Sequence, residues 1–372
     1  MIKVNYEASI SNDGNHERLH RLFERARNGE KLNIGFLGGS ITMGSVATKP
    51  ELCYAHRVFD WFVKSFPNSE FKYINAGIGA TDSHFGVARC DKDLLAYKPD
   101  FVIIEFSVND DSSDHFKETY EGLVRRVYSS GTSPAVFVVH NVMYDNGYTA
   151  ECIHSQIVKH YDLPSCSMKS TIYQEVMSGN VVATDIFPDN LHPNDDGHEL
   201  VASIITWNLE RIASEDFGDL SYQGKTDLPA PLTTNGFENS KRYRNDNSSP
   251  IINDFFVDEA IQDNITDIFK MGWMASTKGA SITFNVEGSS IAIIYRKTKE
   301  LPAPIAKAIL DDDEENALIL DANFDETWGD KLYVDMLLEH GNDKMHTVKI
   351  VLDEVHEEDV LPFYLNGLIV SR

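Results

Sequence analysis

The chain of 372 residues is poor in cysteine and has no long apolar run, and each shortage excludes a class of protein. Four cysteines cannot form a disulfide scaffold at this length, and none has the CxxC spacing of a zinc or redox motif. We therefore expect free, mostly buried thiols at Cys53, Cys90, Cys152 and Cys166. No stretch approaches the roughly 18 apolar residues that a membrane span requires. The N-terminal region lacks the apolar core of a secretory signal, which predicts a cytoplasmic protein.

Positive charge is also scarce, because 33 Lys and Arg stand against 58 Asp and Glu and leave a net charge of −25. A surface of this sign repels phosphate groups, which excludes nucleic acid and anionic membranes as partners. No glycine-rich phosphate-binding fingerprint follows the first apolar segment, so a nucleotide or flavin site is disfavoured and no cofactor is expected. The acidic run 311–315 lacks the alternating ligands and central glycine of a calcium loop. We expect a solvated turn there and no metal site.

The length of the chain predicts two domains. Residues 216–250 are rich in Pro, Gly, Asn, Ser and Thr, a composition typical of linkers and irregular surface segments. This break predicts a first domain over residues 1–215, a linker over 216–250 and a second domain over 251–372. A hydrophobic content of 42% with 24% charged residues is typical of soluble globular domains.

Short apolar runs alternate with amphipathic segments in the first domain. The runs are β-rich and almost continuously apolar, as expected of strands covered on both faces, and they span residues 32–37, 71–76, 101–106, 135–140 and 181–186. Segments with helical periodicity lie between or after them, at residues 55–66, 85–97, 116–128 and 195–212. This alternation predicts right-handed βαβ crossovers, a five-stranded parallel sheet and a three-layer α/β/α sandwich.

Candidate site residues follow four of the five predicted strands. The first strand ends at Gly38-Gly39-Ser40, the second runs into residues 75–83, the third into Ser107-Val108-Asn109-Asp110, and the fifth leads to Asp189-Asn190-Leu191-His192. The carboxyl ends of parallel strands meet at one edge of an open sheet, which is where such sheets bind ligands. We therefore expect these four segments to converge on one site.

Ser40 and Asn109 each have a structural interpretation and a chemical one. A serine at a strand-to-helix turn is a good helix N-cap, and an asparagine in a turn often bonds to its own backbone. In the chemical interpretation Ser40 is a nucleophile and the Asn109 amide donates to a developing oxyanion, a contribution of about 3 kcal/mol to the transition state. Backbone N–H groups of the glycine-containing loop 77–80 are further donors for the same oxyanion.

The pair Asp189 and His192 is the most specific of these signals. A spacing of three residues in a turn lets the carboxylate reach the imidazole, fix its tautomer and stabilise the imidazolium. Pro193 holds the backbone of His192 extended. A serine hydroxyl needs such a base, because its own pKa leaves it a poor nucleophile. The alternative is a surface Asp–His pair, but its occurrence together with the other segments favours a catalytic triad of Ser40, His192 and Asp189.

With these segments in order, the chain resembles the SGNH hydrolases, which belong to the broader GDSL esterase and lipase superfamily. The resemblance covers roughly residues 30–213 and rests on four blocks, namely Gly38-Gly39-Ser40-Ile41-Thr42, residues 75–80, Val108-Asn109-Asp110 and residues 189–192. It implies a flavodoxin-like sheet, Ser40 as nucleophile and His192 as general base. It also implies an oxyanion hole from the Ser40 N–H, an N–H of the second block and the Asn109 side chain.

Two departures from related patterns matter. Many relatives have glycine at the second-block donor, whereas Ala80 aligns best with that position here. Ala80 would keep a usable N–H provided its φ is negative, and Gly79 is the other candidate donor. Thr42 replaces the glycine that follows the serine in the nucleophile elbow of the α/β-hydrolases, so that elbow is excluded.

The second domain has runs of strand length at residues 281–286, 290–295, 318–321 and 346–352, separated by turn signals, which predict an antiparallel β-sandwich. The pattern resembles the jelly-roll modules that accompany some carbohydrate esterases of the superfamily. Trp273 and Trp328 suit either stacking on sugar rings or core packing, and core packing is the favoured interpretation for each. The domain is either a substrate-binding module or a structural cover or oligomerisation surface.

Together these patterns predict a two-domain serine esterase that removes short acyl groups, with acetyl as the favoured acyl group and a carbohydrate as the favoured alcohol. Its expected partner is a small-molecule or oligosaccharide ester, and a homo-oligomer is left open. One alternative is an O-acyltransferase that uses a sugar acceptor in place of water. The other is a non-catalytic carbohydrate-binding protein on the same fold.

Overall fold

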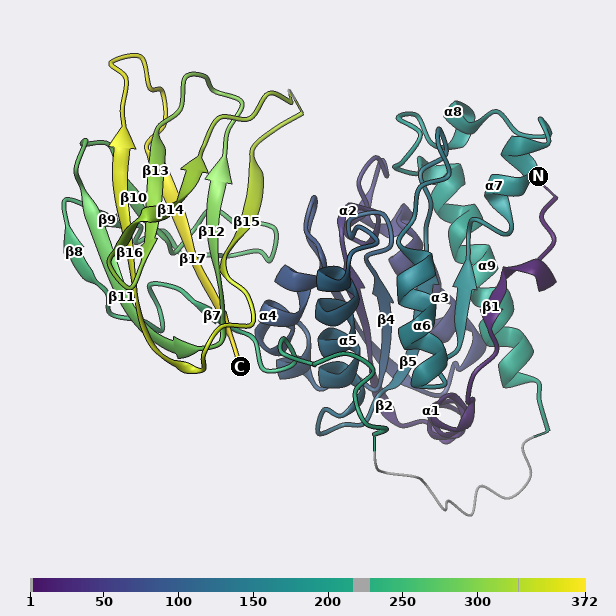
Figure 1. Ribbon diagram of the computed structural model, residues 1–372. Helices are drawn as coiled ribbons and strands as arrows, with labels where there is room; N and C mark the ends of the chain where they lie inside the picture. The colour runs from purple at the N-terminus through teal and green to yellow at the C-terminus, as the bar shows by residue number, and fades with distance from the viewer. Residues whose placement is uncertain (1–2, 217–227, 327) are drawn as a thin grey trace. The chain divides into compact units, whose positions relative to one another are not determined.

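The alternation of apolar strands and amphipathic helices folds the first part of the chain into an α/β sandwich. The computed structural model describes residues 3–216, 228–326 and 328–372. Two compact units, Met1–Asn235 and Gly236–Arg372, divide the chain inside the segment expected as a linker. Part of that segment, residues 217–227, lies outside the described residues. Figure 1 shows the helices and the sheet of the first unit and the strands of the second.

The sheet of the first unit has six strands in the order β1-β6-β5-β4-β2-β3. Their bounds are Ile10–Asn12 (β1), Lys31–Gly38 (β2), Glu70–Gly77 (β3), Phe101–Glu105 (β4), Ala135–His140 (β5) and Ser165–Ser167 (β6). Strands β2 to β6 pair in parallel, and only the short edge strand β1 runs antiparallel to β6. The parallel part of this order is that of a flavodoxin-like fold, as the sequence predicts.

The fifth parallel strand is not the predicted one. Residues 183–186 of the run 181–186 form the short helix α8 (Ala183–Ile186), and β6 takes the fifth place. The sequence of β6 is Ser165-Cys166-Ser167, which is too short and too polar to stand out as an apolar run, yet all three residues are buried between β5 and β1. Ile186 is buried as well, but its apolar side chain packs from a helical turn.

Helices cover both faces of the sheet (Figure 1), which explains why every residue of β4 and β5 is buried. The helices are α1 (Glu17–Arg27), α2 (Ser40–Met43), α3 (Tyr54–Ser65), α4 (Ser83–Asp93), α5 (Asp114–Tyr128), α6 (Glu151–His160), α7 (Ile172–Met177), α8 and α9 (Asp195–Ala213). Helix α9 packs on α1 and α3, and α5 packs on α4 and α6. Short 3-10 turns occur at Glu7–Ser9, Pro50–Leu52 and Leu95–Tyr97. Within the described ranges, no helix has both the length and the apolar character needed to cross a membrane.

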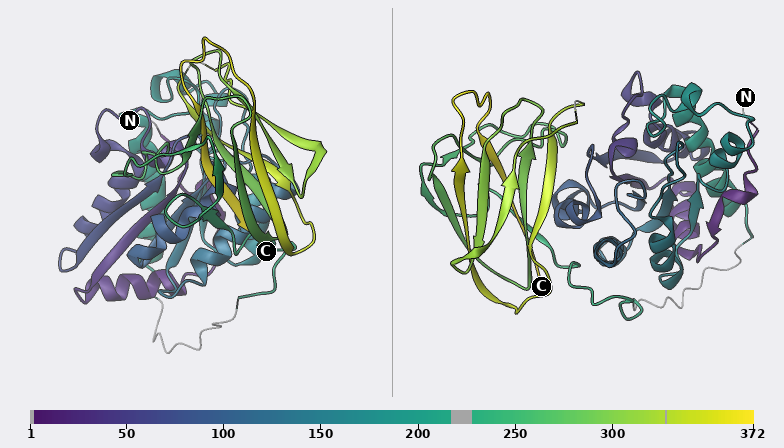
Figure 2. Two further views of the ribbon diagram at one scale, coloured as in Figure 1. Left: turned by 90° about the vertical axis from the view of Figure 1, so that its left-hand side faces the viewer. Right: turned by 45° about the horizontal axis from the view of Figure 1, so that its top comes forward.

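The second unit is an antiparallel β-sandwich, seen from two further sides in Figure 2. Strands β10 (Trp273–Ala275), β11 (Ser281–Gly288), β12 (Ser290–Lys297), β13 (Ile305–Leu310), β14 (Asp313–Asp321), β15 (Lys331–Leu338), β16 (Lys344–Glu354) and β17 (Phe363–Ser371) form nested pairs. The nesting joins β10 with β17, β11 with β16, β12 with β15 and β13 with β14. A long hairpin rolled into two sheets in this way is a jelly roll. The short strands β7 (Lys241–Tyr243), β8 (Ile251–Asn253) and β9 (Phe256–Val257) pair at β17, β11 and β10.

Side chains that alternate along these strands fill the core between the two sheets, and one tryptophan belongs to it. Trp273 is buried and meets Phe284 edge to face, with ring centroids 5.2 Å apart, as core packing predicts. The same expectation is wrong for Trp328, which is 55% exposed beside Phe324. The cysteines behave largely as expected, because all four are free and only Cys152 is exposed.

Candidate active site

Ser40, His192 and Asp189 form a continuous chain of hydrogen bonds. Ser40 follows β2 as the first residue of α2, and its Oγ lies 2.7 Å from His192 Nε2. On the other side of the ring, His192 Nδ1 lies 2.6 Å from Asp189 Oδ2. A carboxylate can only accept, so Nδ1 carries the ring proton and the lone pair of Nε2 faces the Ser40 hydroxyl. This is the tautomer that a base for Ser40 needs.

The loop between α8 and α9 holds the imidazole in this position. Asn190 adopts a left-handed conformation with φ of 62°, which turns the chain back so that Asp189 Oδ1 accepts the N–H groups of Leu191 at 3.0 Å and His192 at 2.7 Å. Partial burial by itself would raise the pKa of Asp189. Hydrogen bonds from the ring and backbone of His192 outweigh it and hold the pKa below its ordinary value. Asp189 is therefore a carboxylate at neutral pH, although its side chain is half exposed.

Glycines let the turn at Ser40 pack against the neighbouring strands. Gly38 pairs in register with Gly77 of β3 and with Glu105 of β4, so the three strands end at the same edge. A Cβ on Gly77 would lie 2.2 Å from the backbone N of Met43, and one on Gly38 would lie 2.5 Å from the carbonyl oxygen of Glu105. Only glycine at these two positions allows α2 to sit so close to the sheet.

Asn109 lies at the same edge as Ser40. The turn after β4 is closed by the N–H of Asn109, which donates to Phe106 O at 3.0 Å. A Cβ built on Gly39 would lie 2.3 Å from Asn109 Oδ1 and 3.4 Å from its Nδ2, so the amide packs directly on the residue before Ser40. Asn109 Oδ1 is buried, and no hydrogen-bond partner for it occurs among the residues that the structure describes. The amide is therefore positioned by packing and by the backbone turn.

The two candidates for the second-block donor differ in conformation. Ala80 has a φ of 55°, so the condition of a negative φ is not met, and its backbone is strained for a residue with a side chain. Gly79 lies beside the nucleophile, because a Cβ built on it would be 3.9 Å from Ser40 Cβ. This geometry favours the N–H of Gly79 over that of Ala80 as the donor.

Sequence reasoning missed a buried pair behind Asn109. The carboxylate of Asp110 accepts the backbone N–H of Ser83 at 2.8 Å and faces His154 Nε2 at 2.9 Å, which ties the turn after β4 to α4 and α6. Burial raises the pKa of Asp110 to about 8 and lowers that of His154 to about 3, so neither group needs to carry a charge at neutral pH. The fully buried histidine stacks on Tyr120, with ring centroids 3.6 Å apart. No motif in the sequence joins residues this far apart.

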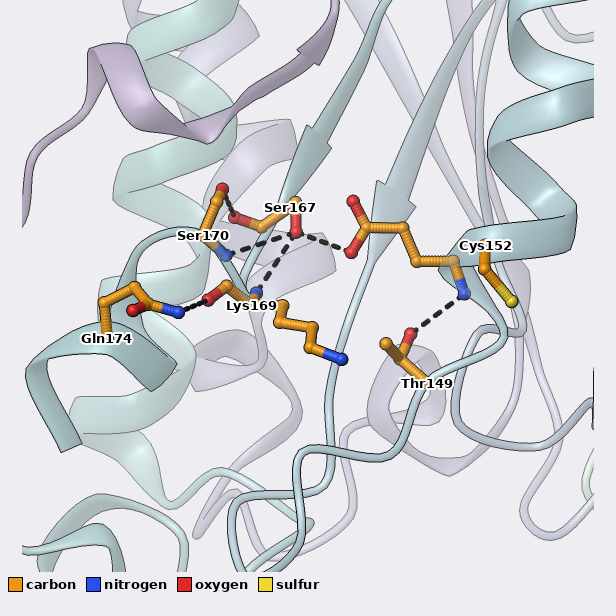
Figure 3. A pocket seen from close by; sticks show the side chains of 7 residues that line it. Thr149, Cys152, Ser167, Lys169, Ser170 and Gln174 are labelled. Atoms are coloured by element: carbon orange, nitrogen blue, oxygen red, sulfur yellow. Dashed lines mark hydrogen bonds between the residues drawn. The ribbon is translucent and has the colours of Figure 1, made fainter. Parts of the chain in front are cut away.

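A separate pocket lies at the carboxyl end of β6 and the start of α6 (Figure 3). Its lining residues are Thr149, Glu151, Cys152, Ser167, Lys169, Ser170 and Gln174. Glu151 Oε2 accepts the Ser167 hydroxyl at 2.7 Å, and Lys169 Nζ donates to Gly147 O at 2.8 Å. None of the predicted site residues lines this pocket, so it is distinct from the cluster around Ser40.

Comparisons with known proteins agree with the fold and with the resemblance to the GDSL superfamily. Residues 36–200 match the GDSL-like Lipase/Acylhydrolase family. A solved two-domain esterase (CEX) active on acetylated mannans is 55% identical, with a TM-score of 0.97 and 99% of each chain covered. A second structure of such an esterase, co-crystallised with mannopentaose, is also 55% identical, with a TM-score of 0.95 over 99% of this chain and 98% of the other. The curated proteins give no match. By family, fold and whole-chain similarity, this chain belongs to the GDSL-like lipases and acylhydrolases and is a carboxylic ester hydrolase.

Proposed function

We propose that this enzyme hydrolyses acetyl esters on mannan-type oligosaccharides through Ser40, His192 and Asp189. The observation that carries the chemistry is the chain of contacts of 2.7 Å and 2.6 Å from the Ser40 hydroxyl through the His192 ring to the Asp189 carboxylate. The substrate class rests on the 55% identical two-domain esterases, which are active on acetylated mannans. The similarity covers 99% of this chain, so it includes the jelly-roll unit.

In the first half of the reaction, Ser40 Oγ attacks the acetyl carbonyl carbon while His192 Nε2 takes the hydroxyl proton. The carbonyl π electrons move to oxygen and give a tetrahedral oxyanion. Collapse of this intermediate breaks the bond to the sugar oxygen, which leaves with the proton from His192 Nε2. The product is a deacetylated sugar hydroxyl, and the acetyl group stays on Ser40.

In the second half, His192 Nε2 takes a proton from water, and the resulting hydroxide equivalent attacks the acetyl carbon. The second tetrahedral intermediate expels Ser40 Oγ, which recovers the proton from His192 and releases acetate. Asp189 stays ionised throughout and stabilises the imidazolium that forms twice in the cycle. Its low pKa suits this role, since a protonated Asp189 would carry no charge to stabilise the imidazolium.

Both oxyanions need donors in place before the reaction begins. We assign the backbone N–H of Ser40, the backbone N–H of Gly79 and the side-chain amide of Asn109 to this role. Ser40 is the first residue of α2, so its N–H has no acceptor within the helix and is available to a ligand. One such donor contributes about 3 to 4 kcal/mol to transition-state stabilisation.

Two other functions are less well supported. Acyl transfer to a sugar acceptor would use the same triad, and a non-catalytic carbohydrate-binding protein would not need it. The esterase relatives favour hydrolysis over both. The cytoplasmic location and a homo-oligomeric state stay predictions.

The test measures acetate release from acetylated mannooligosaccharides and from acetylated xylooligosaccharides, with the wild type, Ser40→Ala and Ser178→Ala. Ser178 is an exposed serine that ends α7, so its variant is a matched control for loss of a hydroxyl. We expect the wild type and Ser178→Ala to prefer the mannan substrate and Ser40→Ala to lose about 10⁶-fold in kcat. Equal rates for wild type and Ser40→Ala would refute the nucleophile. A preference for the xylan substrate would refute the substrate class, and acetylation of an added sugar in place of acetate release would indicate a transferase.

A further inference from the structure

Two buried histidines and a glutamate meet at a point that the catalytic chemistry does not use. His16 precedes α1 as its N-cap, His20 lies one turn further along that helix, and Glu215 follows the end of α9. The two imidazoles are 8% and 4% exposed. One nitrogen from each ring and one carboxylate oxygen lie within 4.8 Å of one another. The segments that meet here are almost 200 residues apart in the sequence.

The surroundings of His16 require a cation in this cluster. His16 Nε2 lies 2.8 Å from the backbone carbonyl oxygen of Asp13, which can only accept, so Nε2 carries a hydrogen. In a neutral ring, Nδ1 then presents its lone pair. That lone pair faces Glu215 Oε2 at 2.9 Å, where the carboxylate also presents lone pairs. Two lone pairs at this distance repel each other unless a proton, on the ring or on the carboxyl group, or a metal ion lies between them.

His20 brings a third donor group to the same point. His20 Nε2 points to the same oxygen, Glu215 Oε2, at 3.0 Å. One carboxylate oxygen can accept hydrogen bonds from both rings, but convergence of several donors on one point is also what a metal ion needs. Two imidazole nitrogens and one carboxylate oxygen are a donor set that zinc uses in proteins. The hydrogen bond from His16 Nε2 to a backbone carbonyl is also the usual outer contact of a metal-bound histidine.

The distances fit an ion after a small adjustment. Zinc binds nitrogen and oxygen at about 2.0 to 2.2 Å, so two ligand atoms at a tetrahedral angle are about 3.3 to 3.5 Å apart. The observed separations of 2.9 Å and 3.0 Å would open by roughly half an ångström, which rotation of the Glu215 side chain supplies. That side chain is partly exposed, so it can move, and the fourth position can be taken by water.

Neighbouring charges orient the carboxylate without occupying the ligand atom. Arg211 Nη1 lies 3.3 Å from Glu215 Oε1 and leaves Oε2 for the two rings. The positive charge of Arg211 is in turn balanced by Asp13, whose Oδ1 lies 2.5 Å from Nη2. The net charge of Asp13, Arg211 and Glu215 is −1, and Arg27, whose Nη2 donates to Ala213 O at 2.8 Å, offsets this charge.

We propose that His16, His20 and Glu215 bind a divalent transition-metal ion, with zinc as the best match, and that this ion ties the start of α1 to the end of α9. None of its ligands belongs to the group around Ser40, so the ion is separate from the ester chemistry. The bound ion would hold the residue that follows the end of α9 against the start of α1. This inference does not depend on the proposed reaction.

The test uses the full chain, stripped with a chelator and dialysed, and titrates it with Zn²⁺ by calorimetry and with Co²⁺ by visible absorption. We expect one equivalent of Zn²⁺ per chain, tetrahedral Co²⁺ bands in the visible range, and a higher Tm with zinc than without it. Glu215→Gln should keep the fold and lose at least about 100-fold in zinc affinity, because even outer contacts of metal ligands contribute 10- to 100-fold. His20→Gln should lose the Co²⁺ bands.

Two control variants separate this site from others. His356→Gln removes an exposed histidine that faces Asp359 at 3.1 Å, and His192→Gln removes the catalytic ring, so both should bind one equivalent as the wild type does. If His20→Gln fails to fold, Glu215→Gln still decides the outcome, since its side chain is partly exposed. Absence of stoichiometric binding in the wild type would mean that the cation is a proton and would refute the proposal. Unchanged binding by folded Glu215→Gln would refute it as well.

Discussion

Replacing Gly39 with alanine should separate catalysis from folding at this site. Gly39 has a φ of −87° and a ψ of −148°, which lies outside the main α and β regions, so an alanine there adds backbone strain. The new Cβ would lie 2.3 Å from Asn109 Oδ1, so the amide must move away from its position beside Ser40. The clash is with the end of a side chain, which can move, so the backbone strain and the clash together should lower the free energy of unfolding by about 1 to 3 kcal/mol.

The expected loss in transition-state stabilisation is larger than the loss in the free energy of unfolding. A displaced amide is equivalent to a missing oxyanion donor, which costs about 10² to 10³ in kcat, or about 3 to 4 kcal/mol. The assay is kcat and KM for acetate release, with thermal unfolding measured on the same samples. Gly38→Ala is the contrasting variant, because its Cβ would lie 2.5 Å from a backbone oxygen, and it should destabilise the fold by at least about 1 to 3 kcal/mol.

A double-mutant cycle tests the proposed cause. If Gly39→Ala acts only by moving the amide, adding it to Asn109→Ala should cause little further loss of kcat. A folded Gly39→Ala variant with the kcat of the wild type would refute the reasoning. Full additivity of the two losses would also refute it, since Gly39 would then act through another contact.

Three further changes have defined outcomes. Asp189→Asn should lower kcat by about 10⁴ with little change in Tm, because it withdraws the carboxylate from the imidazolium; a loss below tenfold would contradict the triad. Burial raises the pKa of Glu105 to about 7, so between about pH 4.5 and 7 the unfolded chain releases a proton that the fold retains, and stability falls as pH rises. Urea unfolding should therefore show that the free energy of unfolding of Glu105→Gln rises by up to about 3 kcal/mol relative to that of the wild type between pH 4.5 and 8. A difference between the two proteins that does not change with pH would exclude this linkage. The Glu121 carboxylate accepts hydrogen bonds from the Tyr161 hydroxyl at 2.5 Å and from the N–H groups of Leu232 at 2.6 Å and Thr233 at 2.7 Å. Glu121→Gln should therefore lower the free energy of unfolding by about 1 to 3 kcal/mol. The measurements are Tm, which should fall, and the rate of proteolysis near residue 232, which should rise.

The sequence determined the fold class because strand and helix periodicities are local properties. Four of the five parallel strands and the long helices α3, α5 and α9 lie where apolar spacing predicts them. The sequence does not predict β6, because this strand depends on contacts that are not local. Its three residues are buried because the strand pairs with β5 and β1, and a strand of three residues has no apolar run from which it could be predicted. The run 181–186 is apolar for a different reason, which is packing from the turn of α8.

The sequence also predicted the chemistry that we propose for the site, because the blocks around Ser40, Asn109 and His192 each have a local reason to be there. Only the tertiary structure decided their geometry. It joined Ser40 to His192 at 2.7 Å across 152 residues, and it gave Ala80 a positive φ that favours Gly79 as the donor. It also brought Asp110 onto His154, and Glu215 onto His16 and His20. These contacts depend on how the helices pack on the sheet, and local sequence patterns do not specify contacts between residues so far apart in the chain.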